Sequence, residues 1–290
     1  MNDQNKTNKQ NNKIRRFLSL LTMDTKELIR SKWTLFYFLT FSIISVGIIF
    51  SGEASEIYGF SGISKFIASL VNISFLLIPI FSLGPSSISI SGMRENLSLE
   101  YMLSFPVTKK EIYLSKFLSI FLVSISTLFF VLFIALSFFR FREVDTKIIT
   151  AFLFILLLSF VFISIGFLIS VLSKTKSSAI ALSLFVWFII IIGGELGTLG
   201  FISVSKIPEI SFFPIIFLNP AETFRVAVIA IFSSSLDILG PFGIYIYSKL
   251  GKSLIPISAL LMSIYGFLTL VIGYKLFSMQ KVSTDIIRRR

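Results

Sequence analysis

The chain has 290 residues, of which 54% are hydrophobic and only 14% are charged. Soluble globular domains carry about 25% charged residues, so the composition excludes that class. The absence of Cys and His excludes disulfides, thiol nucleophiles, Ser–His pairs and histidine-ligated zinc sites. The sequence therefore predicts an all-α membrane protein, with no catalytic residues, no metal site and no cofactor.

Residues 1–12 are polar and nearly free of apolar side chains, which predicts a disordered tail before a single membrane domain over residues 13–290. Residues 13–32 alternate basic and apolar positions at helical spacing, with Phe17 and Leu21 on the apolar side. This pattern predicts an amphipathic helix that lies along the inner membrane face. The alternative is that these cations only determine the membrane topology, and both interpretations remain open.

Six long apolar stretches follow, and each approaches or exceeds the roughly 20 residues that a helix needs to cross a bilayer. Backbone amides must be paired in lipid, so each stretch is predicted to be a membrane-spanning helix. The stretches are residues 33–50, 66–90, 117–139, 148–172, 178–194 and 254–277. The second contains Pro79 and Pro85, whose kinks could be hinges or static packing features.

Six spans place both termini and the even-numbered loops on the same side of the membrane. That side carries 19 of the 27 Lys and Arg residues, and the other side carries eight. Because loops rich in cations stay in the cytoplasm, this bias predicts that both termini are cytoplasmic. The net charge of +12 is thus a topology signal with attraction to anionic lipid, and we expect no nucleic-acid partner.

The second cytoplasmic loop, residues 91–116, is predicted to form an elbow of two helices. A short helix is expected from Asn96 to Ser104, and Phe105–Pro106 ends it because a residue before proline avoids the helical conformation. Thr108 and Glu111 then fit a capping box at the start of the helix that enters the third span. Exposed leucines on this elbow require a soluble partner or the membrane interface to cover them.

The long outer segment, residues 195–253, is unusually apolar for a loop. Within it, Asn219, Pro220 and Glu222 fit the cap, the first position and the third position of a helix. The following apolar stretch is too short to span, so it is predicted to be an interfacial or re-entrant helix on the outer side. An additional span is the alternative, but it would move the basic C-terminus outside.

Few residues in the chain could support chemistry of their own. Glu195 follows the fifth span and fits either a gate in a pathway or a carboxylate that marks a helix end. Glu222 and Arg225 are one helical turn apart and are expected to form a structural ion pair. The scattered methionines fit packing better than Cu(I) binding. Gly251–Lys252–Ser253 lacks the upstream glycine of a phosphate-binding loop, so no ATP site is expected.

Residues 94–116 resemble the cytoplasmic segment of type-2 ATP-binding-cassette (ABC) exporter permeases. The residues that fit the family pattern are Arg94, Glu95, Leu99, Glu100, Leu103, Ser104, Pro106, Val107, Lys109 or Lys110, Glu111 and Lys116. Leu97 and Ser98 depart from it, because the family has Gly and Thr there. Trp187 and the run from Leu218 to Arg225 are similar to one branch, the permeases of the copper-maturation system for nitrous-oxide reductase.

The resemblance implies a permease subunit in the bacterial inner membrane that dimerises, most simply as a homodimer, and couples ATP hydrolysis by a separate cytoplasmic ATPase to export. The residues implied in ATPase docking are Arg94, Glu95, Leu99, Glu100, Tyr101, Ser104, Pro106, Lys109, Lys110 and Glu111.

The resemblance also implies functions on the outer side of the membrane. The residues implied in a pathway or in binding a periplasmic partner are Glu195, Asn219, Pro220, Glu222 and Arg225. The branch implies a role in copper or metalloenzyme maturation. The alternative is a non-transporting membrane scaffold that transmits the conformational work of the ATPase to the periplasmic partner.

Overall fold

The structure is a computed structural model that describes residues 2–53, 62–138, 146–196, 217–232 and 241–280. Every regular element in these ranges is a helix, as the composition predicts. The elements are α1 (Asn2–Ile29), α2 (Lys32–Glu53), α3 (Gly62–Glu95), α4 (Ser98–Leu103), α5 (Lys109–Phe138), α6 (Thr146–Leu172), α7 (Lys176–Phe188), the π-helix η2 (Ile189–Gly193), α10 (Pro220–Phe232), α11 (Pro241–Leu250), the short 3₁₀-helix η5 (Gly251–Ser253) and α12 (Leu254–Met279).

Five helical segments in the described ranges are long and apolar enough to cross a membrane. They are Ser69–Glu95, Lys109–Phe138, Thr146–Leu172, Lys176–Leu196 and Leu254–Met279. Helices α1 and α2 are a sixth candidate when taken as one pair, and a bend of 63° separates them. The described chain thus has five or six candidate spans, in line with the six predicted stretches. Neither α10 nor α11 is among them, so the short, non-spanning helix predicted from Asn219 is observed as α10.

Helix α1 begins at Asn2, which differs from the disordered tail expected for residues 1–12. Residues 2–12 contain neither proline nor glycine, so nothing in them interrupts the helix formed by the residues that follow. Further along, α1 packs against α5. The buried carboxylate of Asp24 accepts a hydrogen bond from Ser115 at 2.8 Å and pairs with Lys116 at 3.0 Å. These polar contacts therefore fix α1 to α5.

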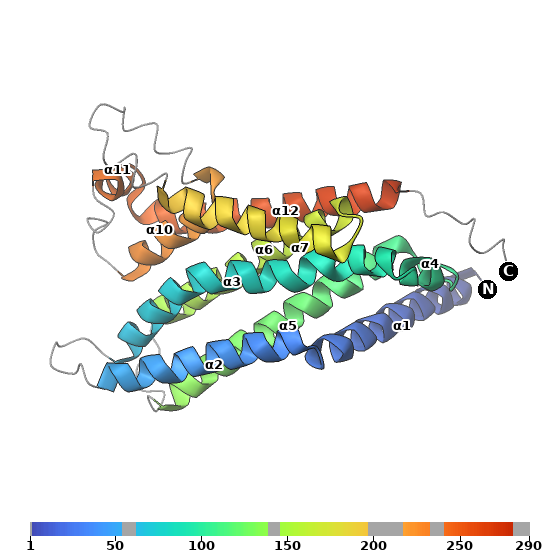
Figure 1. Cartoon of the computed structure of the whole chain (residues 1–290), viewed down its shortest axis with the longest axis horizontal. Coiled ribbons are helices and arrows are strands. Elements are labelled where there is room, and N and C mark those ends of the chain that lie inside the picture. Colours follow the sequence, from blue (N-terminus) through green and yellow to red (C-terminus); the bar gives the residue numbers. More distant parts are fainter. Residues whose placement is uncertain (1, 54–61, 139–145, 197–216, 233–240, 281–290) are drawn as a thin grey trace.

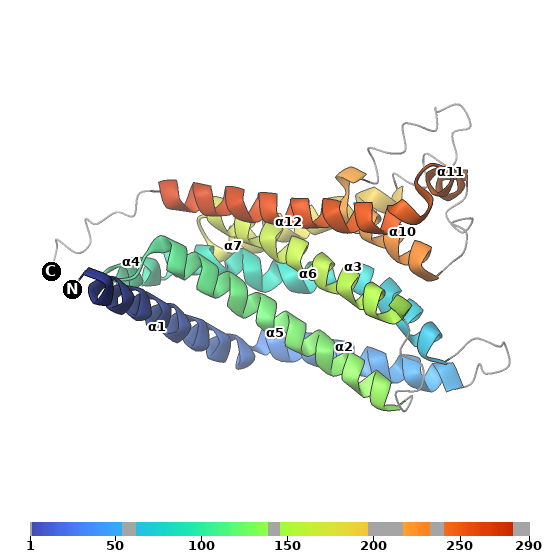
Figure 2. The same ribbon diagram turned by 180° about the vertical axis from the view of Figure 1, so that it is seen from behind.

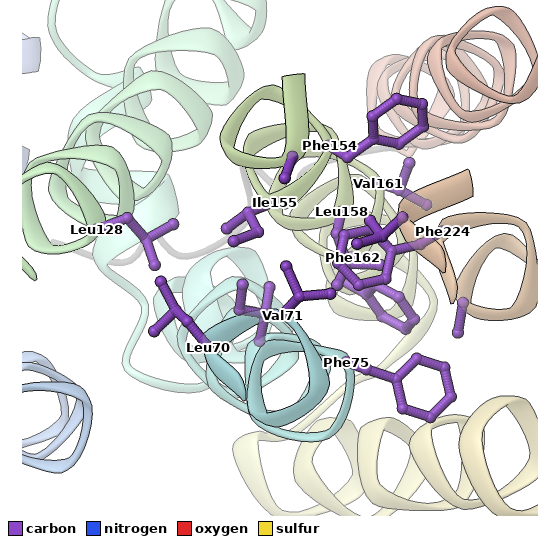
Figure 3. Packing of buried hydrophobic residues seen from close by; sticks show 14 of the residues in the cluster. Leu70, Val71, Phe75, Leu128, Phe154, Ile155, Leu158, Val161, Phe162 and Phe224 are labelled. Atoms are coloured by element: carbon purple, nitrogen blue, oxygen red, sulfur yellow. The ribbon is translucent and has the colours of Figure 1, made fainter. Parts of the chain in front are cut away.

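Helix α6 is the centre of the bundle. It packs against α3, α12 and α10, and most of its side chains are buried. Figure 3 shows Leu158 and Phe162 of α6 between Val71 of α3 and Phe224 of α10, with Leu128 of α5 further along the same core. A helix that is apolar around its whole circumference is typical of such a buried position.

Helix α3 stays helical through Pro79 and Pro85. Pro85 has no N–H group, so it cannot donate to the carbonyl of Phe81 four residues earlier. The indole N–H of Trp33 donates to this carbonyl instead, at 3.3 Å. Gly84 leaves room for the indole, because a Cβ there would overlap its ring. This arrangement favours a static packing feature over a hinge at Pro85.

Close packing and one hydroxyl group join α3 to α6. A Cβ at Gly166 would overlap the hydroxyl of Ser86, so only glycine permits this approach of the two helices. One turn further along α6, the hydroxyl oxygen of Ser170 accepts from the backbone N–H groups of Ile90 and Ser91, at 2.8 and 2.9 Å. The α3–α6 contact is therefore specified by small polar residues rather than by volume alone.

The elements that the sequence assigns to opposite membrane faces lie at opposite ends of the bundle. Both views place the start of α1, helix α4 and the end of α12 at one end (Figures 1 and 2). Helices α10 and α11 lie at the other end. The candidate site therefore has two parts, the elbow around α4 and the polar residues of α10.

Candidate functional site

The elbow begins with a backbone conformation that residues other than glycine rarely adopt. Leu97, between α3 and α4, has a φ of 58° in the left-handed region. Glycine occupies such positions without strain, whereas a residue with a Cβ does not. This is the position at which the family pattern has glycine. The family's glycine is thus explained by the backbone turn that starts α4.

The elbow ends with the predicted capping box. The side chain of Glu111 accepts from the N–H of Thr108 at 2.7 Å, and the hydroxyl of Thr108 accepts from the N–H of Glu111 at 3.2 Å. These two reciprocal bonds satisfy donors that the first turn of α5 would otherwise leave unpaired. The capping box fixes the place where α5 starts, six residues after the end of α4.

Two of the predicted docking residues fasten the elbow to the end of α12. The guanidinium of Arg94 donates to the side-chain oxygen of Gln280 and to the carbonyl of Ser173, just after α6. The ammonium of Lys109 donates to the carbonyls of Ser278, at 3.2 Å, and Gln280. Both side chains therefore connect α3 and α5 to the last span.

Glu95, Leu99 and Glu100 are three further predicted docking residues, and each has a different environment. Glu95 accepts from the backbone N–H of Lys176 at the start of α7, where a helix dipole favours a carboxylate. Leu99 is 3% exposed and belongs to the apolar cluster beneath the elbow. Glu100 is partly buried, and one of its carboxylate oxygens has no hydrogen-bond partner among the residues that the structure describes.

The outward face of the elbow is apolar. Tyr101 is 67% exposed, and its ring lies 5.2 Å from that of Phe105, which is itself half exposed. Leu97 lies beside them in sequence and is also half exposed. We call Leu97, Tyr101 and Phe105 the α4 surface. The other predicted docking residues that are exposed here are Ser104, Pro106 and Lys110.

The polar residues of the outer end converge on α7. The side-chain oxygen of Asn219 accepts from the N–H of Ala221 at 2.9 Å, which confirms it as the cap of α10, with Pro220 in the first position. Its Nδ2 donates to the carbonyl of Ile190 at 2.7 Å, inside the π-helix η2. A Cβ at Gly194 would overlap this amide, so glycine allows α10 to approach α7.

A charge cluster lies next to this contact. Arg225 pairs with Glu222 at 3.1 Å, as predicted, and also lies 3.6 Å from Glu195. Its guanidinium is 5.8 Å from the centre of the Phe75 ring on α3. The side chain of Glu222 is fully buried, and burial raises the pKa of its carboxyl although the charge of Arg225 opposes this. The structure therefore brings four of the five predicted outer residues into contact across α7 and α10.

Several residues of both parts are not predicted by the sequence. Phe105 completes the α4 surface, Arg16 of α1 donates to the carbonyl of Pro106, and Gln280 connects Arg94 to α12. The contacts of Arg16 and Gln280 join positions far apart in the chain, so no local pattern could reveal them. The π-helix is also unpredicted, because a run of isoleucines gives no sign of a change in helical pitch. Among the described residues, no group of three or more Asp or Glu could hold a metal ion.

One known protein family matches most of this chain. Residues 18–282 match the family described as ABC-2 family transporter protein, so the chain belongs to this family. The resemblance of the chain to type-2 ABC permeases is thereby confirmed. Members of such permease families are membrane subunits rather than enzymes, and the chain is accordingly a multi-pass permease of an ABC transporter.

Two relatives are each named as a probable ABC transporter permease protein NosY. The one from Stutzerimonas stutzeri is 27% identical over 273 residues, which cover 86% of this chain and 93% of the relative. The one from Pseudomonas aeruginosa is 29% identical over 218 residues, which cover 70% of this chain and 79% of the relative.

Proposed function

We propose that the chain is the membrane subunit of an exporter and that a separate cytoplasmic ATPase docks on the α4 surface. The observation that carries this proposal is the exposure of Leu97, Tyr101 and Phe105 at the end of the bundle where α1 starts and α12 ends. Exposed apolar patches of this kind mark interaction sites. Family membership supplies the class of partner, because an ABC permease works with an ABC ATPase.

The elbow residues that bond to other parts of the chain have a different role in this proposal. Arg94 donates to the side chain of Gln280, and Lys109 donates to the carbonyls of Ser278 and Gln280. A displacement of α4 therefore acts on α12 as well as on α3 and α5. Glu95 transmits it to the start of α7. These side chains join the docking surface to α3, α5, α7 and α12, while Leu97, Tyr101 and Phe105 contact the ATPase. Lys110 and Glu111 flank that surface.

The orientation and assembly follow from charge and family. The excess of Lys and Arg in the even-numbered loops supports cytoplasmic termini in a bacterial inner membrane. A single permease chain has one α4 surface, whereas the two ATPase subunits of a cassette close on each other and need two. We therefore infer that two copies of the chain form the transporter, as a homodimer.

At the outer end we infer that the Asn219–Glu222–Arg225 cluster couples α10 to α7, so that motion of the spans reaches a periplasmic partner. The resemblance to the copper-maturation branch supports a role in metalloenzyme maturation. The chain has no Cys or His, and its methionines are scattered, so its sequence supplies no obvious copper site for such a cargo.

The docking proposal is tested with the double substitution Tyr101→Ala and Phe105→Ala. The tagged permease is co-expressed with the cassette ATPase that we expect its coding neighbourhood to contain, and the two are purified together. We expect the variant to insert normally but to lose at least tenfold in ATPase recovered, because two aromatic anchors leave the interface. The control is Met23→Ala, an exposed apolar residue of α1 outside the α4 surface. Full recovery with the double variant would refute docking at this surface.

Transport is tested separately from docking. Reconstituted complex that moves cargo across vesicles in an ATP-dependent manner supports the exporter. ATP hydrolysis that drives maturation of a periplasmic partner, with no movement of solute, would instead support the scaffold.

A further inference from the structure

A cavity of about 300 Å³ lies where α1 bends into α2. Residues of α3, α5, α7 and the start of α4 complete its lining. Figure 1 shows this bend beside α5, below the elbow end of α3. Glu27, Trp33 and Asn96 line the cavity and are exposed, so it reaches the surface of the bundle. Its volume is at the lower end of the range for small-ligand sites, about 300–1,000 Å³.

The cavity is lined by two positive and two negative side chains. Asp24 and Lys116 pair with each other at 3.0 Å. Glu27 and Lys176 bring a second pair of opposite charges to the same cavity, and neither has an ion-pair partner in the described part of the chain. The lining therefore offers one unpaired anion and one unpaired cation.

The position of Lys176 depends on a glycine. A Cβ at Gly92 would lie 2.9 Å from Cε of Lys176, so the aliphatic stem of the lysine crosses α3 at this residue. The backbone N–H of Lys176 is held by Glu95 at 2.5 Å, which fixes the start of the side chain. The stem of Lys176 therefore lies against α3, in the lining of the cavity.

The remaining lining suits the part of a lipid next to its headgroup. Leu28, Pro85, Ile88 and Ile120 are apolar. Trp33 lines the cavity at the bend, and tryptophan is enriched where the apolar core of a membrane meets the headgroups. An anionic headgroup would meet two carboxylates here, and a cationic ligand would meet two ammonium groups. A ligand with a phosphate and an ammonium group satisfies both.

We propose that this cavity binds a zwitterionic headgroup, that of phosphatidylethanolamine, with its phosphate at Lys176 and its ammonium at Glu27. The glycerol and the first acyl carbons then contact the apolar wall and Trp33. The inference requires only that the chain lies in a bilayer and is independent of ATPase docking.

Tryptophan fluorescence tests the proposal. The chain has two Trp residues, so Trp187→Phe leaves Trp33 as the only reporter. This variant is placed in vesicles that contain acyl-brominated phosphatidylethanolamine or acyl-brominated phosphatidylglycerol, and the quenching of Trp33 gives the relative association constant of each lipid. We expect a preference of about threefold or more for phosphatidylethanolamine, as a partly exposed ion-pair site permits.

Charge substitutions in the same background show whether the cavity causes the preference. Glu27→Gln with Lys176→Gln should lower the ratio to about one, and Lys174→Gln, an exposed lysine two residues away, should leave it unchanged. Lys176→Gln alone keeps the backbone bond to Glu95 and replaces the double variant if that fails to insert. Equal quenching by both lipids before any charge is removed would overturn the proposal. Relief of quenching by millimolar soluble phosphoethanolamine would overturn the lipid as the source of the headgroup.

Discussion

At the scale of single residues, Leu97 is the clearest departure from local preference. It adopts a left-handed conformation that costs a residue with a Cβ roughly 1–2 kcal/mol. Half of its side chain is exposed, so its packing returns little of that cost. A strained residue is retained in the turn that presents Tyr101 and Phe105, which suggests that the apolar side chain at this position has a use in docking.

Leu97→Gly is expected to raise the free energy of unfolding by about 1 kcal/mol, because glycine adopts this conformation freely. Unfolding in mixed micelles measures the change. Leu97→Ala is the matched control, since it removes the side chain but keeps the Cβ, and it should give no such gain. Equal stability of the Leu97→Gly and Leu97→Ala variants would show that the backbone at position 97 is not strained.

The buried ion pair at the outer end gives a second prediction. Arg225→Gln leaves the carboxylate of Glu222 buried without its nearest cation, which should cost about 3 kcal/mol. Glu222→Gln together with Arg225→Gln removes both charges and should cost less than the sum of the two single changes. A double-mutant cycle of unfolding free energies measures this. Additive costs would show that the two charges do not interact.

Glu222 is also expected to make the stability of the chain depend on pH. Because burial raises the pKa of Glu222 in the folded chain, its protonated form is favoured there, and its contribution to stability is fully present below the ordinary value of 4.5. That contribution falls as the pH rises through the raised pKa. The Gln variant, which is always neutral, should gain melting temperature relative to the wild type as the pH increases from about 4.5 to 8. A constant difference across this range would contradict the raised pKa.

At the scale of elements, one side chain with two functions joins the start of α10 to the π-helix that follows α7. Asn219 caps α10 and donates to the carbonyl of Ile190 in the π-helix. A π-helix shifts the backbone pairing by one residue, so it leaves carbonyls that accept bonds from outside. The π-helix and the cap thus depend on each other, which makes α10 follow any movement of the outer half of α7.

Substitutions of Asn219 separate these two functions. Serine is also a good cap, but it is shorter and should not reach Ile190, whereas alanine loses both contacts. Asn219→Ala should cost about 1 kcal/mol more than Asn219→Ser, and Asn219→Ser itself should cost about 1 kcal/mol relative to the wild type. Unfolding in micelles gives both numbers. If the serine variant were as stable as the wild type, the hydrogen bond from Asn219 to Ile190 would not contribute to stability.

The sequence predicts the helices and their caps because both depend on neighbouring residues. Hydrophobicity predicts the spans, and the side chains of Thr108 and Asn219 predict where α5 and α10 begin. The division of the elbow into an inner and an outer face does not follow from the sequence. Arg94 and Tyr101 both fit the family pattern, but Arg94 is turned toward Gln280, 186 residues away, and Tyr101 is exposed. Such contacts depend on the packing of α12, which no local pattern encodes.

At the scale of the whole molecule, α12 is one of the helices that connect the two ends. Helix α12 is held at the elbow by Arg94 and Lys109, and it packs against α10 at its other end. The hydroxyl of Tyr265 on α12 donates to the carbonyl of Phe217, just before α10. The last span therefore provides a continuous connection between the proposed docking surface and the outer cluster.

The orientation of this connection can be measured because the natural chain has no Cys. Ser104→Cys lies beside the α4 surface, Ser248→Cys lies on α11, and both positions are exposed. In intact cells, a maleimide that cannot cross membranes should label Ser248→Cys and not Ser104→Cys. Opening the inner membrane should make Ser104→Cys reactive, which controls for its accessibility. Labelling of Ser104→Cys in intact cells would reverse the assigned topology and end the docking proposal.

The hydroxyl of Ser170 has one more consequence. It accepts from the amide N–H groups of Ile90 and Ser91 in addition to the bonds within α3, so both amides lose one acceptor when α3 separates from α6. In deuterated buffer, these two protons should exchange more slowly while the helices touch than after the helices part. Their exchange rates therefore report on the opening of the bundle, and mass spectrometry can follow them without an attached probe.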